Sequence, residues 1–206
     1  MRTVTKATLL DATAQLARID ADLARVRMLH GPPPLWARRP GFATLVRIIL
    51  EQQVSLASAR AVYAALERGI GRVTPERVRM VGIRSLRAAG LTRQKARYLS
   101  ELADGVMAGR VDLARIRTLS DPDARVALTA VRGIGPWTAD IYLIMALRRP
   151  DVWPVADLAL AKSVQRLKRL RRVPDEARLQ RIAAAWRPWR SVAARLTWHY
   201  YLRGYG

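Results

Sequence analysis

The sequence contains no cysteine and very little lysine. Without cysteine the chain has no disulfide, no thiolate metal ligand, no cysteine-ligated iron–sulfur cluster and no cysteine nucleophile. This absence fits a reducing cytoplasm. Because lysine is so rare, nearly all of the positive charge is arginine. The lysines are Lys6, Lys95, Lys162 and Lys168.

Acidic residues are also scarce relative to basic ones. The chain has 37 Lys and Arg against 16 Asp and Glu, a formal net charge of +21 and a pI near 11.7. Such a charge raises the local concentration of a polyanion and its association rate, which favours nucleic acid as the partner. The alternative is that a GC-rich genome inflates arginine and that most of these side chains are simply solvated.

Long apolar segments are missing as well. The longest apolar run extends only from Ile141 to Leu147, whereas a membrane-spanning helix needs about 20 residues. The N-terminus lacks the apolar core of a signal peptide. We therefore expect a cytoplasmic protein, associated with the nucleoid, with no membrane partner. The chain has 206 residues, of which 50% are apolar and 26% charged, a composition that suits one globular domain or two small lobes.

Apolar residues recur with the spacing of helices, and no strand pattern competes with them. From Thr5 to Met28 the steps of three and four predict one amphipathic helix, which the prolines after Gly31 end. Thr74 begins a further predicted helix, and Ser120-Asp121-Pro122-Asp123 resembles a helix cap with proline at N1 or N2. The sequence therefore predicts an all-α protein. The other predicted helices are about 42–53, 56–66, 92–107, 123–130, 136–148, 157–171, 175–186 and 188–202.

A glycine-rich hairpin separates two of these helices and predicts a helix-hairpin-helix motif at about 123–148. Gly133 and Gly135 permit a tight turn, and Pro136 suits the first position of a helix because its missing N–H has no partner there anyway. Unpaired amides at the positive end of a helix suit a phosphate. The alternative is an ordinary tight turn between two helices.

One acidic residue lies among apolar neighbours. Asp157 is flanked by Val155, Ala156 and Leu158, and its simplest role is to cap the following helix. Beside a nucleic-acid backbone held by the hairpin, the same carboxylate would stabilise a developing positive charge or orient an attacking water. Asp140 is expected to be solvated or to cap its helix.

Four segments together resemble the helix-hairpin-helix DNA glycosylases, specifically the branch of 3-methyladenine DNA glycosylase II. Their order covers most of the chain from about Pro34 onward. The chain has no room for the β-rich N-terminal domain that some members carry, so it resembles the short, all-helical form. The four segments are Ile48–Ser55, Val131–Ala139, Pro154–Asp157 and Trp186–Ser191.

The resemblance implies a single HhH-GPD module over 1–206, with two helical lobes and a DNA-binding cleft. One lobe would be about 32–149 with the hairpin, and the other about 1–31 plus 150–206. The implied activity is base-excision repair on double-stranded DNA: a monomer that hydrolyses the N-glycosidic bond of alkylated purines, chiefly 3-methyladenine, with 7-methylguanine as a further candidate. The relatives that also cleave the backbone carry a lysine where this chain has Trp137, so the enzyme should be monofunctional.

The resemblance also assigns the catalytic role to Asp157 and the DNA-binding roles to the hairpin. Amides near Gly133 and Gly135 would hold phosphates, and Thr138 would either contact phosphate or cap its own helix. No cofactor is required. A structural Na⁺ or K⁺ would bind the backbone carbonyls of Thr129, Val131 and Ile134.

Further residues are assigned to the flipped base and the DNA around it. Trp137 and Trp198 are the expected pocket residues, with Tyr142 a weaker candidate, because an aromatic face attracts a cationic base by about 0.5 to 2 kcal/mol. Core packing is the alternative for each. Gln53 resembles the wedge that fills the gap left by a flipped base, unless it is a buried amide at a helix end. The other tryptophans, and Gln52, are taken as structural. The remaining expected phosphate contacts are Arg132, Lys162 and Lys95.

Two other functions remain open from the sequence. The nearest enzymatic one is a glycosylase for a deaminated or oxidised base, because pocket shape beyond the tryptophans is not written in the sequence. The other is a non-catalytic helix-hairpin-helix protein that senses damaged DNA.

Overall fold

The structure is a computed structural model that describes residues 3–204. Within that range every regular element is a helix, which confirms the all-α prediction. The chain forms two compact units: residues 38–142 make one, and residues 1–37 together with 143–206 make the other. No helix in the described range is long and apolar enough to cross a membrane.

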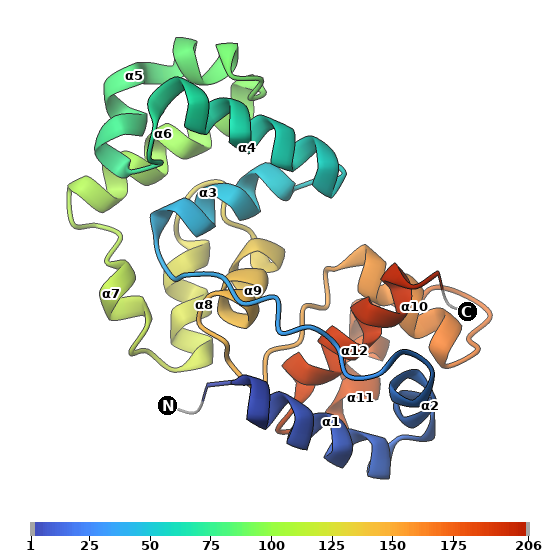
Figure 1. Cartoon of the computed structure of the whole chain (residues 1–206). Coiled ribbons are helices and arrows are strands. Elements are labelled where there is room, and N and C mark those ends of the chain that lie inside the picture. The colour runs from blue at the N-terminus through green and yellow to red at the C-terminus, as the bar shows by residue number, and fades with distance from the viewer. Residues whose placement is uncertain (1–2, 205–206) are drawn as a thin grey trace. The chain divides into compact units, whose positions relative to one another are not determined.

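The unit of residues 38–142 is built largely from consecutive helices. In it α5 packs along α6, α3 packs against both α4 and α6, and α7 against α8 (Figure 1). Its core is aliphatic, with Leu45, Ile48, Leu66 and Leu99 completely buried. The helices are α3 (Phe42–Glu51), α4 (Leu56–Ile70), α5 (Pro75–Ala88), α6 (Arg93–Met107), α7 (Leu113–Ile116), α8 (Asp121–Thr129) and α9 (Pro136–Met145), which ends just past the unit.

The other unit is organised around one buried helix. Its helices are α1 (Lys6–Ile19), α2 (Ala21–His30), α10 (Leu158–Leu167), α11 (Glu176–Ala184) and α12 (Arg190–Leu202). Residues Ser191–Tyr200 of α12 are all buried, and α12 packs against α1, α2, α10 and α11. A helix that other helices cover on every side lies in the core of its unit, and α12 has this position.

The predicted helix starts coincide with side-chain caps. Thr74, Thr92, Ser120 and Asp175 each accept a hydrogen bond from the backbone amide three residues later. Such a bond satisfies one of the amides that a helix start leaves without a partner. These starts are therefore confirmed, whereas the four-residue helix α7 is too short to show any apolar periodicity.

The prediction of a single helix from Thr5 to Met28 is wrong, because Asp20 interrupts the helix. Asp20 has an extended backbone, with φ of −141°, and its carboxylate caps α2 by accepting the amides of Asp22 and Leu23 at 3.0 and 3.3 Å. Aspartate competes in this way with helical backbone bonds. The apolar spacing continues through the break, so periodicity alone does not reveal it.

Asp20 also anchors more distant parts of its unit. Its carboxylate accepts the Lys168 ammonium at 2.7 Å and the indole N–H of the buried Trp186 at 2.7 Å. Burial alone would raise the pKa of Asp20, but the hydrogen bonds from Lys168 and Trp186 outweigh it and hold that pKa below its usual value. The α1–α2 corner is thereby joined to the end of α10 and the segment before α12.

A buried arginine holds backbone segments together in the same unit. The Arg195 guanidinium donates to the carbonyl oxygens of Leu35, Ser191 and Ile144 at 3.0, 3.0 and 2.7 Å. Burial lowers the pKa of Arg195 to about 10, so the side chain stays charged at neutral pH. Its planar fork of donors ties α12 to the chain before α3 and to the end of α9.

Replacing Asp20 with Asn should destabilise the protein in a pH-dependent way. At pH 7 we expect the free energy of unfolding to fall by about 1 to 3 kcal/mol, because Lys168 and Trp186 lose a charged acceptor. The lowered pKa of Asp20 contributes stability that is present above the unfolded value of 3.8 and lost as pH falls through the folded value. Urea unfolding of both proteins at pH 7 and below pH 4 measures this.

The matched control is Asp11→Asn, on an exposed position of α1. It should change unfolding by less than about 0.5 kcal/mol. A difference between wild type and Asp20→Asn that stays constant down to the lowest pH would contradict the assignment of the charge to Asp20.

Candidate nucleic-acid interface and catalytic carboxylate

The predicted helix-hairpin-helix motif is present, formed by α8, a tight turn and α9. Two short backbone bonds close the turn: the Val131 amide donates to the Leu128 carbonyl at 3.1 Å, and the Ile134 amide donates to the Val131 carbonyl at 3.0 Å. The Ile134 side chain is buried. The turn is therefore fixed from inside by an apolar anchor.

The amides of the two hairpin glycines remain available. Among residues 3–204 neither Gly133 nor Gly135 donates its N–H to a protein acceptor, and Gly135 and Pro136 are exposed. Unpaired amides that precede a helix N-terminus attract anions. The geometry of the turn thus suits a phosphate oxygen.

The two glycines have different reasons to be glycine. Gly133 has φ of +87°, and a Cβ added there would overlap the Tyr98 ring of α6. Gly135 has no left-handed conformation, and a Cβ there would meet nothing within 4 Å. The turn therefore depends on Gly133 for its conformation and its close packing on α6, while Gly135 leaves open space in front of the turn.

Gln52 connects the end of α3 to the hairpin. Its amide Nε2 donates to the Gly133 carbonyl at 2.9 Å and to the Thr138 hydroxyl at 2.8 Å. This confirms the structural role expected of Gln52. Thr138 is only 1% exposed, and its hydroxyl bonds Gln52 inside the unit. Thr138 is therefore left out of the phosphate contacts proposed below.

Lys95 supports the same segment from α6, which corrects the expectation that it reaches phosphate. Its ammonium donates to the carbonyl oxygens of Leu50 and Gln52, both at 2.8 Å. Burial lowers the pKa of Lys95. The last carbonyls of a helix lack intrahelical partners, and Lys95 satisfies two of them at the end of α3. The sequence indicates that the carbonyls at the end of α3 need hydrogen-bond donors, but it does not indicate that Lys95 supplies them.

Gln53 lies at the tip of the α3–α4 connection and points away from the core. It is a non-glycine residue with φ of +55°, a conformation that is uncommon and costs about 1 kcal/mol or more. Gln53 is exposed, and its neighbours Val54 and Leu56 are 47% and 49% exposed. Hence the buried-amide alternative describes Gln52, not Gln53.

Asp157 has the N-cap role that its position predicts, and it also contacts a tryptophan of α12. It is buried, and its Oδ1 accepts the Leu160 amide at 2.7 Å as the N-cap of α10. The same oxygen accepts the indole N–H of Trp198 from α12 at 3.2 Å. A carboxylate offers about four acceptor sites, so one oxygen can accept both of these hydrogen bonds. The structure brings Asp157 and Trp198, far apart in sequence, into direct contact.

The other acidic candidates are engaged in ion pairs. Asp140 is buried, and its Oδ1 accepts Arg125 Nε at 2.7 Å and Nη2 at 2.6 Å. The expectation that Asp140 is solvated or caps its helix is therefore wrong, because α8 supplies a cation that covers it. Asp151 pairs with Arg190 through both carboxylate oxygens, at 2.8 and 2.9 Å.

The aromatic candidates divide by burial. Tyr142 is completely buried, its hydroxyl accepts the Gly41 amide at 2.9 Å, and burial raises its pKa. It holds the start of α3 and does not enter the pocket proposed below. Trp137 is half-buried at the start of α9, whereas Trp153 and Trp186 are buried against each other with ring centroids 5.1 Å apart, as expected of structural residues.

The remaining predicted residues lie at the surface. Arg132 on the hairpin and Lys162 on α10 are exposed. Among residues 3–204 no group of three or more His, Cys, Asp or Glu side chains is placed to hold a metal ion. In the unit of residues 38–142 the candidates are the hairpin amides, Arg132 and Trp137, and in the other unit they are Asp157, Trp198 and Lys162.

These features define an all-helical protein with a helix-hairpin-helix motif whose unpaired amides suit a phosphate. The family pattern of the HhH-GPD superfamily base excision DNA repair proteins matches residues 46–189, more than half of the sequence. The chain belongs to this superfamily. The matched range includes the part of α3 from Val46 onward, the hairpin and Asp157.

Relatives within the superfamily share both sequence and fold. DNA-3-methyladenine glycosylase 1 of Schizosaccharomyces pombe is 26% identical over 91% of this chain and 85% of its own length. A solved structure of the S. pombe 3-methyladenine DNA glycosylase with abasic DNA has a TM-score of 0.84, covering 91% of this chain and 95% of that one. A DNA-3-methyladenine glycosidase from Bacillus halodurans has a TM-score of 0.79 at 29% identity, covering 98% and 93%.

The two hairpin glycines should respond differently to substitution by alanine. We expect Gly133→Ala to lower the free energy of unfolding by about 1 to 3 kcal/mol, because it combines left-handed strain with overlap on Tyr98. Gly135→Ala should leave stability within about 0.5 kcal/mol of wild type. Thermal and urea unfolding of the two variants, side by side, provide the measurement; equal losses would refute the assignment of the tight contact to Gly133.

Proposed function

We propose that this protein is a base-excision repair glycosylase that hydrolyses the N-glycosidic bond of alkylated purines in double-stranded DNA, chiefly 3-methyladenine. The observation that carries the proposal is the buried Asp157 carboxylate in contact with the Trp198 indole. The relatives named for 3-methyladenine support the lesion class.

The hairpin would position the DNA. The unpaired amides of Gly133 and Gly135 hold a backbone phosphate, and the exposed Arg132 and Lys162 add charge to phosphates. These contacts carry no base sequence information, which suits an enzyme that must act wherever a lesion occurs. The net charge of +21 strengthens the attraction to the duplex.

Asp157 would act on the sugar of the flipped nucleotide. When the bond between C1′ and the base nitrogen breaks, its electron pair leaves with the base and positive charge develops on the deoxyribose. The carboxylate stabilises that charge or orients the water whose oxygen then bonds to C1′, with the water proton released. An abasic site and a free base result. A purine alkylated on a ring nitrogen is already cationic, so it leaves as a neutral base.

The base would be recognised by aromatic faces. The Trp198 ring and the half-buried Trp137 attract a cationic purine by about 0.5 to 2 kcal/mol. The hydrogen bond to Asp157 fixes the Trp198 ring in place, and it lets one carboxylate position the residue that binds the base. Trp137 has no amine, which fits an enzyme without backbone cleavage through a Schiff base.

Gln53 would serve as the wedge. Flipping a base costs a few kcal/mol in lost stacking. The exposed Gln53 side chain, flanked by the exposed Val54 and Leu56, fills the vacated space from a loop that Gln52 and Lys95 hold firmly.

A monovalent cation and the cellular setting complete the proposal. Thr129 is the last residue of α8, and at this negative helix end a Na⁺ or K⁺ ion would bind the carbonyl oxygens of Thr129, Val131 and Ile134. The ion would add positive charge toward the phosphate. We propose that the protein works as a monomer on nucleoid DNA in the cytoplasm.

Asp157→Asn should abolish excision while leaving DNA affinity largely intact. Asn still caps α10, so the fold is kept, but the negative charge is gone and excision should fall by about 100-fold or more. Single-turnover release of free 3-methyladenine from alkylated DNA measures the rate, and fluorescence anisotropy measures affinity.

The matched control is Asp175→Asn, which removes the charge from the N-cap of α11 instead. Its excision rate should equal that of wild type. Equal excision by wild type and Asp157→Asn would remove Asp157 from the mechanism, and no base released by wild type would indicate a non-catalytic DNA-binding protein.

The two functions of Trp198 should separate in two substitutions. Trp198→Phe keeps an aromatic ring but loses the N–H donor to Asp157, whereas Trp198→Ala loses both. We expect the Phe variant to retain preference for alkylated over undamaged DNA with a slower excision rate, and the Ala variant to lose both preference and rate. Competition binding with undamaged duplex and single-turnover excision distinguish these effects. Unchanged preference in the Ala variant would argue against a base-binding role.

A further inference from the structure

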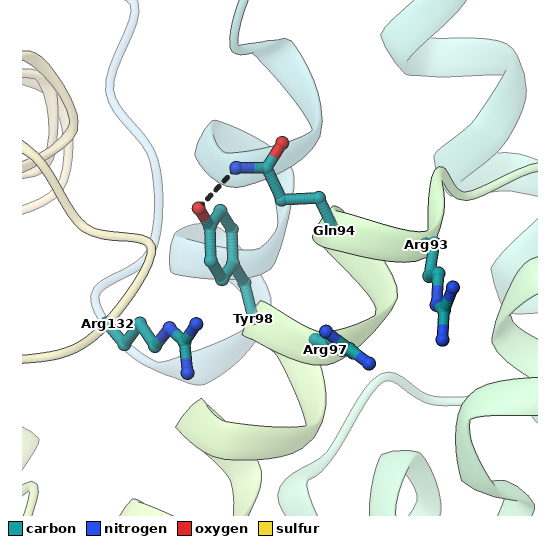
Figure 2. A pocket seen from close by; sticks show the side chains of 5 residues that line it. All are labelled: Arg93, Gln94, Arg97, Tyr98 and Arg132. Carbon is teal, nitrogen blue, oxygen red and sulfur yellow. Dashed lines mark hydrogen bonds between the residues drawn. The ribbon is translucent and has the colours of Figure 1, made fainter.

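A pocket of about 330 Å³ lies between the hairpin and the exposed face of α6. Apart from Arg132 and Tyr98, its residues take no part in the interface described above. Its lining residues are Arg93, Gln94, Arg97, Tyr98 and Arg132. Figure 2 shows Arg132 approaching from the hairpin on one side of Tyr98, with Arg93 and Arg97 along α6 on the other. All five residues belong to the unit of residues 38–142.

The pocket concentrates positive charge with little to balance it. Arg93 and Arg97 form no ion pair with any residue from 3 to 204, and both are exposed. Like charges four residues apart on a helix repel each other. Glu101 of α6 pairs with Arg132 of the lining, at 3.3 Å between side chains that are 39% and 72% exposed. An ion pair this exposed is weak and easily exchanged for another anion.

The neighbouring lysine does not share this role. Lys95 lies between the two arginines in sequence, but its ammonium is turned to the carbonyls of Leu50 and Gln52. Charges on the pocket face of α6 are therefore guanidinium groups, which match phosphate oxygens with pairs of parallel hydrogen bonds. The Gln94 amide donates to the Tyr98 hydroxyl, which fixes the polar wall between the arginines and the hairpin.

The pocket adjoins the phosphate-binding turn directly. Tyr98 forms part of its wall, and the same ring packs so closely on Gly133 that a Cβ there would overlap it. An anion in the pocket therefore lies next to one held by the Gly133 and Gly135 amides. DNA offers such neighbouring anions at regular spacing along one strand, whereas a single free phosphate uses only one of the two places.

We propose that Arg93, Arg97 and Arg132 bind a second backbone phosphate of duplex DNA, next to the phosphate held by the hairpin amides. This inference rests on the proposed function for the presence of DNA, and it adds a subsite that lengthens the contact with the backbone. The lining residues of the pocket all belong to the unit of residues 38–142 and Asp157 belongs to the other unit, so we assign the pocket to binding and not to bond cleavage.

The test compares the salt dependence of DNA binding in two double variants of equal charge. Arg93→Gln/Arg97→Gln changes the pocket, and Arg84→Gln/Arg87→Gln removes two exposed arginines of α5 outside it. Binding to an undamaged duplex is measured by anisotropy at several salt concentrations. For the pocket variant, the slope of log affinity against log salt should decrease in magnitude by about 0.9, the value for one lost phosphate contact. The control variant should keep the wild-type slope.

A neutral phosphate locates the subsite on the DNA. In duplexes that carry one abasic site to fix the register of binding, a single methylphosphonate placed at successive positions should lower wild-type affinity at two adjacent positions of one strand. The pocket variant should lose sensitivity at one of these positions and keep it at the other. Equal slopes for the wild type and both variants, or no position at which the pocket variant differs, would overturn the proposal.

Two further readouts keep other outcomes apart. Millimolar inorganic phosphate should not raise the melting temperature of wild type more than that of the pocket variant; if it does so while the DNA slopes are equal, the pocket is a site for free phosphate and the proposal fails. Single-turnover excision at saturating protein should be the same in the pocket variant and wild type. Absence of excision by wild type would contradict the proposed function while leaving the binding comparison valid.

Discussion

The unit that carries the hairpin depends on the Gln52 side-chain amide. Its two hydrogen bonds reach the carbonyl of Gly133 and the hydroxyl of Thr138, so one side chain joins the end of α3 to both halves of the hairpin. Lys95 holds the same α3 end from α6. The exposed Gln53 thus projects from a segment that hydrogen bonds hold in place. This arrangement suits the proposed wedge role, because less conformational entropy of the loop is lost when the side chain inserts into DNA.

Local interactions explain why much of the fold was predictable. Helix starts at Thr74, Thr92 and Ser120 follow from caps that reach only three residues along the chain. The hairpin follows from adjacent glycines and a proline. Asp157 shows that local and distant roles coexist, since it caps α10 as its position suggests and also accepts the Trp198 indole.

The parts that sequence reasoning missed depend on partners far along the chain. Asp140 was expected to be solvated, but Arg125 of α8 donates a hydrogen bond to its carboxylate. Lys95 looked like a phosphate ligand until α6 placed it at the end of α3. Tyr142 is aromatic, as a residue of a base pocket should be, but its side chain is buried and its hydroxyl accepts the Gly41 amide. Periodicity reports which face of a helix is apolar and does not report which neighbour supplies a hydrogen bond.

Because Gly133 packs on Tyr98, the glycine turn depends on residues outside it and cannot be transferred alone to another protein. The turn needs a flat ring from α6 beneath it, the Gln52 amide beside it and the buried Ile134 within it. Grafted alone onto another helical scaffold, the same residues would lack these supports and would sample many conformations. A larger residue at position 133 would meet the Tyr98 Cβ as well as its ring, so a smaller side chain at position 98 would not by itself make room for it.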